Sequence, residues 1–126
     1  MKARIGIADE ELVRKYMLCV SAGKLNHVED IPHFWFASLM ELAQILSNDN
    51  IKLLNVIYHE RPNSVGKLSE ITGHSVEDLS ISIDDLSSKG FVRIDIWGNE
   101  ESLTAIYTSF EIIMGKELEA QLLQPL

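Results

Sequence analysis

The sequence lacks the features that mark secreted, membrane-spanning and zinc-binding proteins. Cys19 is the only cysteine among 126 residues, so the chain has no internal disulfide and no cysteine pair for a structural zinc site. No apolar run approaches the roughly 20 residues that cross a bilayer, and no charged segment precedes an apolar signal-peptide core. We therefore expect a cytoplasmic protein without a membrane anchor.

Basic residues are also scarce. The chain has 11 Lys and Arg against 19 Asp and Glu, which gives a formal net charge of -8. Nucleic acid could therefore be bound only through a local basic patch and not through the field of the whole protein. Hydrophobic residues make up 46% of the chain, which predicts a folded globular protein and not a disordered one.

Motifs for catalysis and metal binding are missing as well. No phosphate-binding glycine loop, nucleophile elbow or catalytically spaced pair of carboxylates is present. The four histidines are scattered, and no two of them are four residues apart on a helix. The segment "NHVEDIPH" could gather metal ligands, but a polar loop explains it equally well. We predict no enzymatic activity, no cofactor and no metal ion.

The first third of the chain predicts a strand, a helix and an aromatic connector. Residues 4–7 are typical of a short strand, and Leu12, Tyr16 and Val20 follow at helical spacing up to a stop at Gly23. Three adjacent aromatic residues then occupy positions 34–36. They either anchor the connector to the following core or, with Tyr16, line a small-molecule pocket, and we favour the anchor.

Four further helices are predicted, over residues 38–47, 48–61, 64–73 and 75–90. Ser38 and Glu41 form a capping box at the start of the first helix. Pro62 stops the second helix, because the residue before a proline avoids the helical conformation. The short turn at Gly73 joins the last two helices in a helix-turn-helix arrangement.

The apolar period changes from 3.6 to 2 after Gly90. "FVRIDIW" and "SLTAIYT" alternate on either side of the turn signal "GNEE", which predicts a two-stranded hairpin. The last segment, "SFEIIMGKELEAQLLQPL", begins apolar and ends in an apolar helical stripe, which packs within its own domain or against a second subunit. We predict an α+β fold with a winged helix-turn-helix domain at 34–113. It is preceded by a strand, helix and connector at 1–33 and followed by a helix at 114–126, and the terminal helices are expected to form a homodimer.

One long segment, "FASLMELAQILSNDNIKLLNVIYHERPNSVGKLSEITGHSVEDLSISIDDLSSKGFV", is followed by the hairpin and by "IYTSFEII". It resembles a family of small bacterial and archaeal predicted transcriptional regulators with a MarR-like winged helix, of which a haloarchaeal DNA-binding protein is typical. The matching positions are Phe36, Ser38, Leu42, Leu46, Pro62, Ser64, Gly90, Phe91 and Val92. The resemblance implies a winged helix that regulates transcription by binding double-stranded DNA. Some members are encoded beside small toxins of the TumE kind, which implies an antitoxin role as an alternative.

The chain departs from this family in the helix at 75–90. Where family members carry cations after the turn glycine and again one turn later, this chain has His74, Ser75, Glu77, Ser80, Ile81 and Ser82. From Ser64 to Thr108, three cations stand against eight acids, a net charge of -5. Acids in the first turn stabilise a helix through its dipole. The same turn of a recognition helix approaches DNA, so these acids also repel phosphate.

Two functions from different classes follow. The first is DNA binding by a transcriptional regulator, for which the candidate contacts are Lys67, His74, Ser75, Ser80, Ser82, Lys89, Arg93 and Asn99. The second is an acidic protein-interaction module that binds a basic toxin or nucleic-acid-handling protein, for which the candidate contacts are Glu77, Asp78, Ile81, Asp84 and Asp85. In both cases a stripe on the same helix is expected to face the core, namely Val76, Leu79, Ile83 and Leu86.

Overall fold

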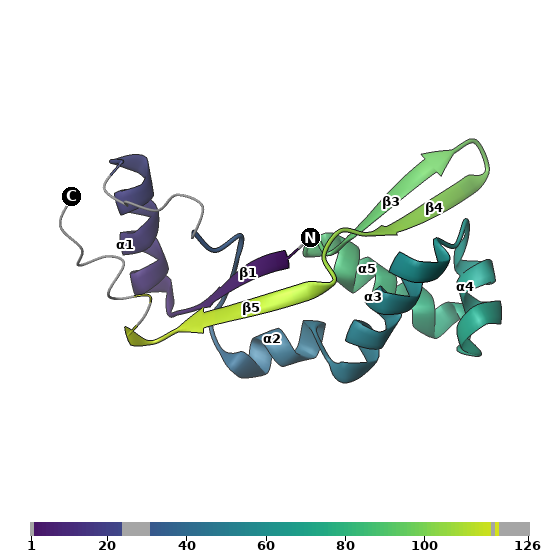
Figure 1. Ribbon diagram of the computed structural model, residues 1–126, viewed down its shortest axis with the longest axis horizontal. Coiled ribbons are helices and arrows are strands. Elements are labelled where there is room, and N and C mark those ends of the chain that lie inside the picture. The colour runs from purple at the N-terminus through teal and green to yellow at the C-terminus, as the bar shows by residue number, and fades with distance from the viewer. Residues whose placement is uncertain (1, 24–30, 117, 119–126) are drawn as a thin grey trace. The chain divides into compact units, whose positions relative to one another are not determined.

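A computed structural model describes residues 2–23, 31–116 and 118 of the chain. Within these residues it has an α+β fold with five helices and five strands (Figure 1). The chain divides into two compact units. Residues 45–108 make the first, which we call the helical unit. Residues 2–44 and the chain from 109 onward make the second, which we call the sheet unit.

The sheet unit is built on three parallel strands, β1 (Lys2–Ile7), β2 (Phe34–Phe36) and β5 (Ser109–Met114). Their order is β2-β1-β5, so the N-terminal strand lies in the middle. Ile5 is in register with Phe34 on one side and with Ile112 on the other. Parallel strands need long connections, and here the helical unit lies entirely between β2 and β5 in the sequence.

This pairing changes two of our expectations. The aromatic residues 34–36 form a strand and not a connector, because their backbone pairs with β1. The expected domain limits of 34–113 also differ from the observed units, since β2 and β5 belong with β1 in the sheet. The expected helix at 114–126 lies outside the described residues except for 114–116 and 118, and Met114 is the last residue of β5.

Helix α1 (Glu10–Ser21) covers one face of this sheet. Asp9 caps it by accepting a hydrogen bond from the Leu12 N–H at 2.8 Å. Tyr16 is its buried residue, and its ring meets that of Trp35 edge-on with 5.0 Å between centroids. Ile113 and Leu118 complete this small core. The aromatic rings therefore fill the interior under α1, which supports the anchor interpretation.

Gly6 is required at the centre of the sheet. The Trp35 ring lies directly over this residue, and a Cβ atom added there would collide with the ring carbons. The neighbouring strand positions Ile5 and Ile7 are buried. A glycine on β1 thus makes room for a tryptophan on β2, which is a close approach that no larger residue permits.

Helix α2 (Leu39–Ile45) begins with both predicted capping residues, but Glu41 accepts from the residue before Ser38 and not from Ser38 itself. The Ser38 hydroxyl oxygen accepts from the Glu41 N–H at 3.1 Å, and the Glu41 carboxylate accepts from the Ala37 N–H at 2.9 Å. The helix ends at Ile45, close to the expected Ser47, which caps the next helix. Leu42 is its buried residue.

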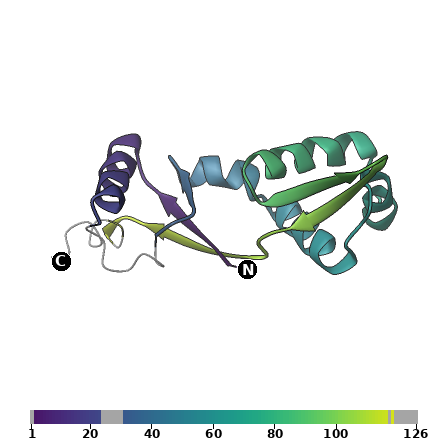
Figure 2. The same ribbon diagram turned by 90° about the horizontal axis from the view of Figure 1, so that it is seen from above.

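The helical unit contains α3 (Asn48–Glu60), α4 (Val65–Thr72), α5 (Val76–Ser88) and the hairpin β3 (Val92–Trp97) and β4 (Glu100–Ala105). These three helices and the hairpin are confirmed within a residue or two of the expected limits. Arg61 ends α3 with a left-handed φ of 46° directly before Pro62. Helix α5 lies against β3, and α3 against β4 (Figure 2). The core of this unit includes the fully buried side chains Leu54, Ile57, Leu68, Ile83, Leu86, Phe91 and Leu103.

Among the helices of residues 2–23, 31–116 and 118, none is long and apolar enough to reach across a bilayer.

Candidate nucleic-acid interface

A tight turn sets the direction of α5 after α4. Gly73 adopts a φ of 77°, a left-handed conformation that glycine allows at low cost. The Ser69 hydroxyl donates to the His74 carbonyl at 2.6 Å, and the Ser75 hydroxyl oxygen accepts from the Asp78 N–H at 3.2 Å. The first turn of α5 is therefore fixed by local hydrogen bonds, and its side chains are held at the surface.

Helix α5 buries one stripe and exposes the rest. Leu79, Ile83 and Leu86 face the core, as their spacing predicts. The prediction for Val76 was wrong, since this residue is 48% exposed. It occupies the first helical position, where the chain has only just left the turn, so it projects beyond the neighbours that cover the other three. On the outer side Ile81 is 64% exposed, an unusual position for an isoleucine.

All four acids of α5 lie at the surface. Glu77, Asp78, Asp84 and Asp85 are exposed, and Glu77 and Asp78 lie in the first turn, where the helix dipole favours them. With Ile81 they form what we call the acidic face of α5, defined by these five residues. The serines expected to accompany them are less available, because Ser80 and Ser82 are half-buried.

The candidate cations are engaged with acids of the same unit. Lys67 forms an ion pair with Glu70 at 3.5 Å, and Arg93 forms one with Asp95 at 3.1 Å. Both pairs are solvent-exposed, so each contributes little stability and can be exchanged for another partner. Lys89 is exposed at the C-terminal cap of α5. These are the three cations between Ser64 and Thr108.

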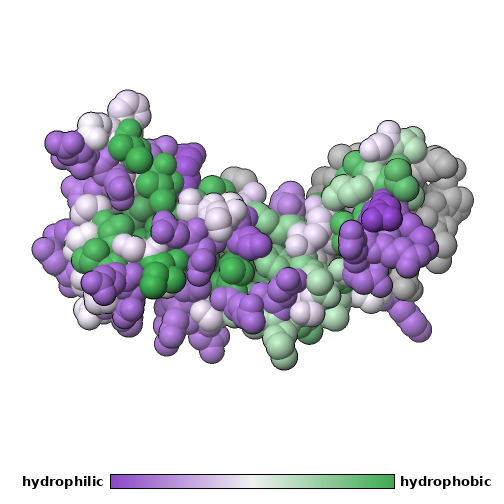
Figure 3. All heavy atoms as spheres, turned by 180° about the vertical axis from the view of Figure 1, so that it is seen from behind, coloured by the Kyte–Doolittle hydropathy of each residue, from purple (hydrophilic) through white to green (hydrophobic). Residues whose placement is uncertain are grey.

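The hairpin tip is apolar and acidic. Gly98 and Asn99 make its two-residue turn, with Trp97 opposite Glu100 in the register, and the candidate Asn99 is exposed there. Trp97 is 77% exposed and Ile96 is 68% exposed. On the face drawn in Figure 3, hydrophobic residues reach the surface among hydrophilic ones. Sequence reasoning predicted the hairpin but missed this apolar tip, although the alternation already placed Trp97 on the side of Arg93 and Asp95.

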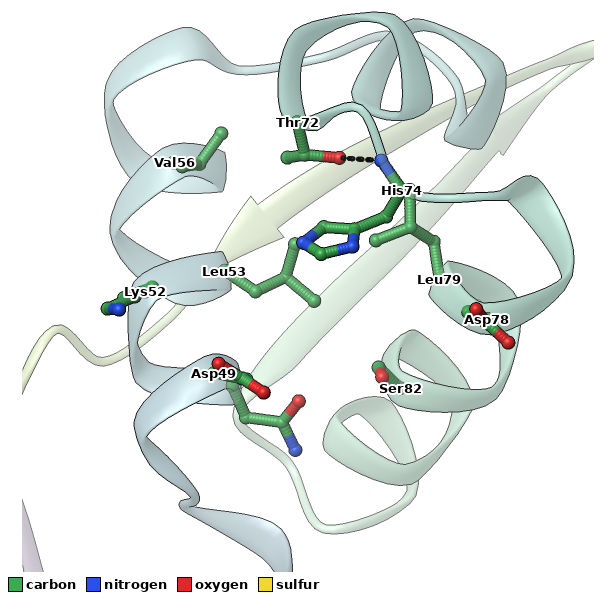
Figure 4. A pocket seen from close by; sticks show the side chains of 10 residues that line it. Asp49, Lys52, Leu53, Val56, Thr72, His74, Asp78, Leu79 and Ser82 are labelled. Carbon is green, nitrogen blue, oxygen red and sulfur yellow. Dashed lines mark hydrogen bonds between the residues drawn. The ribbon is translucent and has the colours of Figure 1, made fainter.

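A pocket of about 380 Å³ lies beside the first turn of α5, between α3, the turn after α4 and α5. The His74 ring extends into it above Leu53, while Asp49 and Asp78 come from opposite walls (Figure 4). Ser82 also lines it. Two of the candidate DNA contacts, His74 and Ser82, therefore face a pocket shared with α3. Sequence reasoning missed Asp49 because it is separated from Asp78 by 29 positions, with no local pattern to connect them.

The charges divide unequally between the two units. The helical unit has five cations against ten acids, a net charge of -5. The sheet unit, counted over the whole sequence, has six cations against nine acids, a net charge of -3. Its cations are Lys2, Arg4, Arg14, Lys15, Lys24 and Lys116, and its acids are Asp9, Glu10, Glu11, Glu29, Asp30, Glu41, Glu111, Glu117 and Glu119. The larger share of the net charge of -8 is thus on the unit that carries α5.

Comparisons with known proteins leave the chain unassigned. No protein-family model matches the sequence, and no curated protein matches it. Within the described residues, no group of three or more His, Cys, Asp or Glu side chains is arranged to hold a metal ion.

Proposed function

We propose that residues 45–108 form a winged helix-turn-helix that binds double-stranded DNA and regulates transcription. The observation that supports this most is the order and exposure of three elements. Helix α4 is followed by a three-residue turn, by α5 with its first turn and outer side at the surface, and directly by the hairpin. This is the order in which winged helix-turn-helix proteins present a recognition helix and a wing.

The proposal gives the candidate residues separate roles. Ser75 and Ile81 lie where α5 would meet base edges, and the Ile81 side chain suits contact with a thymine methyl group. Lys67, Lys89 and Arg93 would bind phosphate, with Lys67 and Arg93 released from Glu70 and Asp95. Asn99 would lie at the tip of the wing. With so few cations, we expect the affinity for DNA to depend weakly on salt. Each phosphate neutralised should lower the logarithm of the binding constant by about 0.9 for a tenfold rise in salt concentration.

Fluorescence anisotropy tests this proposal. The full chain is titrated onto the duplex upstream of its own gene and onto a scrambled duplex of equal length, over a series of salt concentrations. We expect preferential binding to the upstream duplex, and a smaller salt slope when Lys89 and Arg93 are both replaced by alanine. Equal binding to the two duplexes, or no binding at low salt, would contradict the proposal.

A second function, binding of a basic protein in the manner of an antitoxin, is favoured by the acidic face of α5. Four exposed carboxylates surround an exposed Ile81 on this one helix. Complementary charge would steer a basic partner to this surface, and the isoleucine would supply a buried anchor in the complex. A duplex gains nothing from these carboxylates, since like charges repel.

One double substitution separates the two functions. Replacing Asp84 and Asp85 with lysine should strengthen binding to the upstream duplex if α5 faces DNA, and should weaken co-purification of the adjacent gene's product if α5 faces a basic protein. The matched control replaces Glu10 and Glu11 of α1, which are also adjacent and exposed. The control makes the same change in net charge on the sheet unit, so only an effect specific to α5 counts for either function.

A further inference from the structure

The pocket beside the first turn of α5 combines an apolar floor with polar walls. Its volume of about 380 Å³ is within the range of small-molecule sites, which is roughly 300–1,000 Å³. Leu53 and Leu79 are buried in its floor, and Val56 is half-buried beside them. Every residue that lines it belongs to the helical unit, all of which the structure describes. The pocket can therefore receive a small molecule with an apolar body.

Hydrogen bonds hold the polar walls of this pocket in place. The Thr72 hydroxyl donates to the Leu68 carbonyl at 2.9 Å and accepts from the His74 N–H at 3.3 Å (Figure 4). The Asn50 side-chain amide donates to the Ile45 carbonyl at 2.8 Å. Walls that are already ordered lose less conformational entropy when a ligand binds. The site is thus largely formed in the unliganded chain.

Two acids of the pocket have no cation as a partner. Asp49 of α3 and Asp78 of α5 line it from opposite sides (Figure 4). Within residues 2–23, 31–116 and 118, neither carboxylate takes part in an ion pair or a side-chain hydrogen bond. By contrast, Glu70 and Asp95 of the same unit each have an ion pair. The pocket therefore offers two carboxylates as acceptors beside an apolar floor.

We propose that this pocket binds a small amine, with the ammonium group between Asp49 and Asp78 and the apolar body against Leu53 and Leu79. An ammonium group donates three hydrogen bonds and accepts none, so it complements carboxylates. Lys52 also lines the pocket, but its side chain extends away from the space between the two acids (Figure 4). The net charge of -5 on the helical unit also favours a cation over an anion.

A series of probes with similar shapes tests the charge of the ligand. Phenethylamine, 2-phenylethanol and phenylacetate carry the same ring on a cation, a neutral group and an anion. Each is titrated into the isotope-labelled full chain and followed by the backbone amide signals in NMR spectra. We expect phenethylamine to shift the signals of Asp49, His74 and Asp78 to saturation. Its affinity should exceed that of the other two probes by about tenfold or more, because only the cation forms charged hydrogen bonds to both acids.

Removal of the two carboxylates tests their role. Asp49→Asn together with Asp78→Asn keeps the size of both side chains and should weaken phenethylamine binding by about tenfold or more. The matched control is Asp84→Asn together with Asp85→Asn. These exposed acids also lie on α5 but do not line the pocket, so the same change in net charge should leave the affinity nearly unaltered. Circular dichroism should show that both variants are folded.

A filled pocket separates a specific site from general attraction to an acidic surface. Ser82 is half-buried and lines the pocket, so Ser82→Leu adds volume there without changing any charge. We expect this variant to lose saturable binding of phenethylamine.

The proposal is overturned if phenethylamine binds no better than phenylacetate, or if Ser82→Leu binds it as well as the unmodified chain. Equal affinities of the Asp49→Asn, Asp78→Asn variant and its control would also overturn it. No DNA is present in these experiments, so their result is independent of the proposed DNA binding.

Discussion

The helical unit and the sheet unit differ in how far apart in the sequence their contacts are. The helical unit is one continuous segment, and its antiparallel hairpin closes through two residues. The sheet unit joins segments from both ends of the chain, and the Arg4–Glu111 ion pair spans 107 positions. Local contacts leave signals in the sequence, such as caps and turn residues, whereas distant parallel strands leave none that connects them. The two units therefore differ in how well they can be predicted.

A smaller side chain in the core of one unit should produce the largest difference between the stabilities of the two units. Leu54 is fully buried in α3, and Leu54→Ala should lower the free energy of unfolding of the helical unit by about 2–5 kcal/mol. The chain has two tryptophans, Trp35 in the sheet unit and Trp97 in the hairpin. In a Trp97→Phe background, the fluorescence of Trp35 reports on the sheet unit alone, while circular dichroism follows the helices.

We expect Leu54→Ala to shift the transition seen by circular dichroism more than the transition seen by Trp35. The sheet unit keeps its own core when residues 45–108 unfold. Its free energy of unfolding then changes mainly by the entropy of closing a long loop. Equal shifts with both probes would show that the two units unfold as one.

An added methyl group should distinguish a glycine that is needed from one that is not. Gly6→Ala would force the new Cβ atom into the Trp35 ring, and the sheet unit should lose about 1–3 kcal/mol. Gly66→Ala in α4 meets only the Ser64 hydroxyl at 3.7 Å, so the helical unit should gain about 0.5–1 kcal/mol. Urea denaturation shows whether each substitution raises or lowers the free energy of unfolding. No change for Gly6→Ala would mean that Trp35 can move aside.

The elements that could be predicted from the sequence lie mainly in the helical unit, and those that were missed depend on distant residues. The capped helices at 38–88 and the hairpin were predicted because Ser38, Ser64, Gly73 and Pro62 act on neighbours a few residues away. The strand at 34–36 was missed because three aromatic residues have the same pattern whether they anchor a loop or pair with β1. The acidic face of α5 was visible in the sequence, since helical spacing defines a face. The pocket beside His74 was not, since its walls come from separate helices.

Loss of a helix cap should cost about the same in both units. Asp9 caps α1 in the sheet unit, and Ser64 caps α4 in the helical unit by accepting from the Lys67 N–H at 2.9 Å. Asp9→Ala and Ser64→Ala should each lower the free energy of unfolding by about 1 kcal/mol. Thermal unfolding of the two variants checks this, and a much larger loss for Asp9→Ala would show that the sheet unit depends on α1 more than capping explains.

Acid should weaken the sheet unit through Glu111. The hydrogen bond from Lys2 and the charge of Arg4 lower the pKa of this carboxyl, and they outweigh the partial desolvation that raises it. A carboxyl whose folded pKa is lowered contributes stability above its unfolded pKa, and this stability is lost as the pH falls through the folded pKa. The loss is thus expected below the ordinary range of a glutamate, about pH 4.3.

This acid effect should be the smallest of those described. Glu111→Gln removes the titrating group, so the stability of the sheet unit should fall less steeply with acid in this variant than in the unmodified chain. Urea denaturation followed by Trp35 fluorescence over a pH series measures the difference. Identical pH profiles for the two proteins would show that the pairs with Lys2 and Arg4 do not stabilise the fold.

The position of β1 between β2 and β5 sets an order of events during synthesis. β1 is made before its partner at 109–114, which follows more than a hundred residues later. The helical unit, by contrast, is complete with residue 108, and its contacts are mostly local, which favours fast folding. The helical unit can therefore fold while β1 still lacks β5 at one edge of its sheet. Translation that stops before residue 109 would release a chain with the centre of that sheet uncovered.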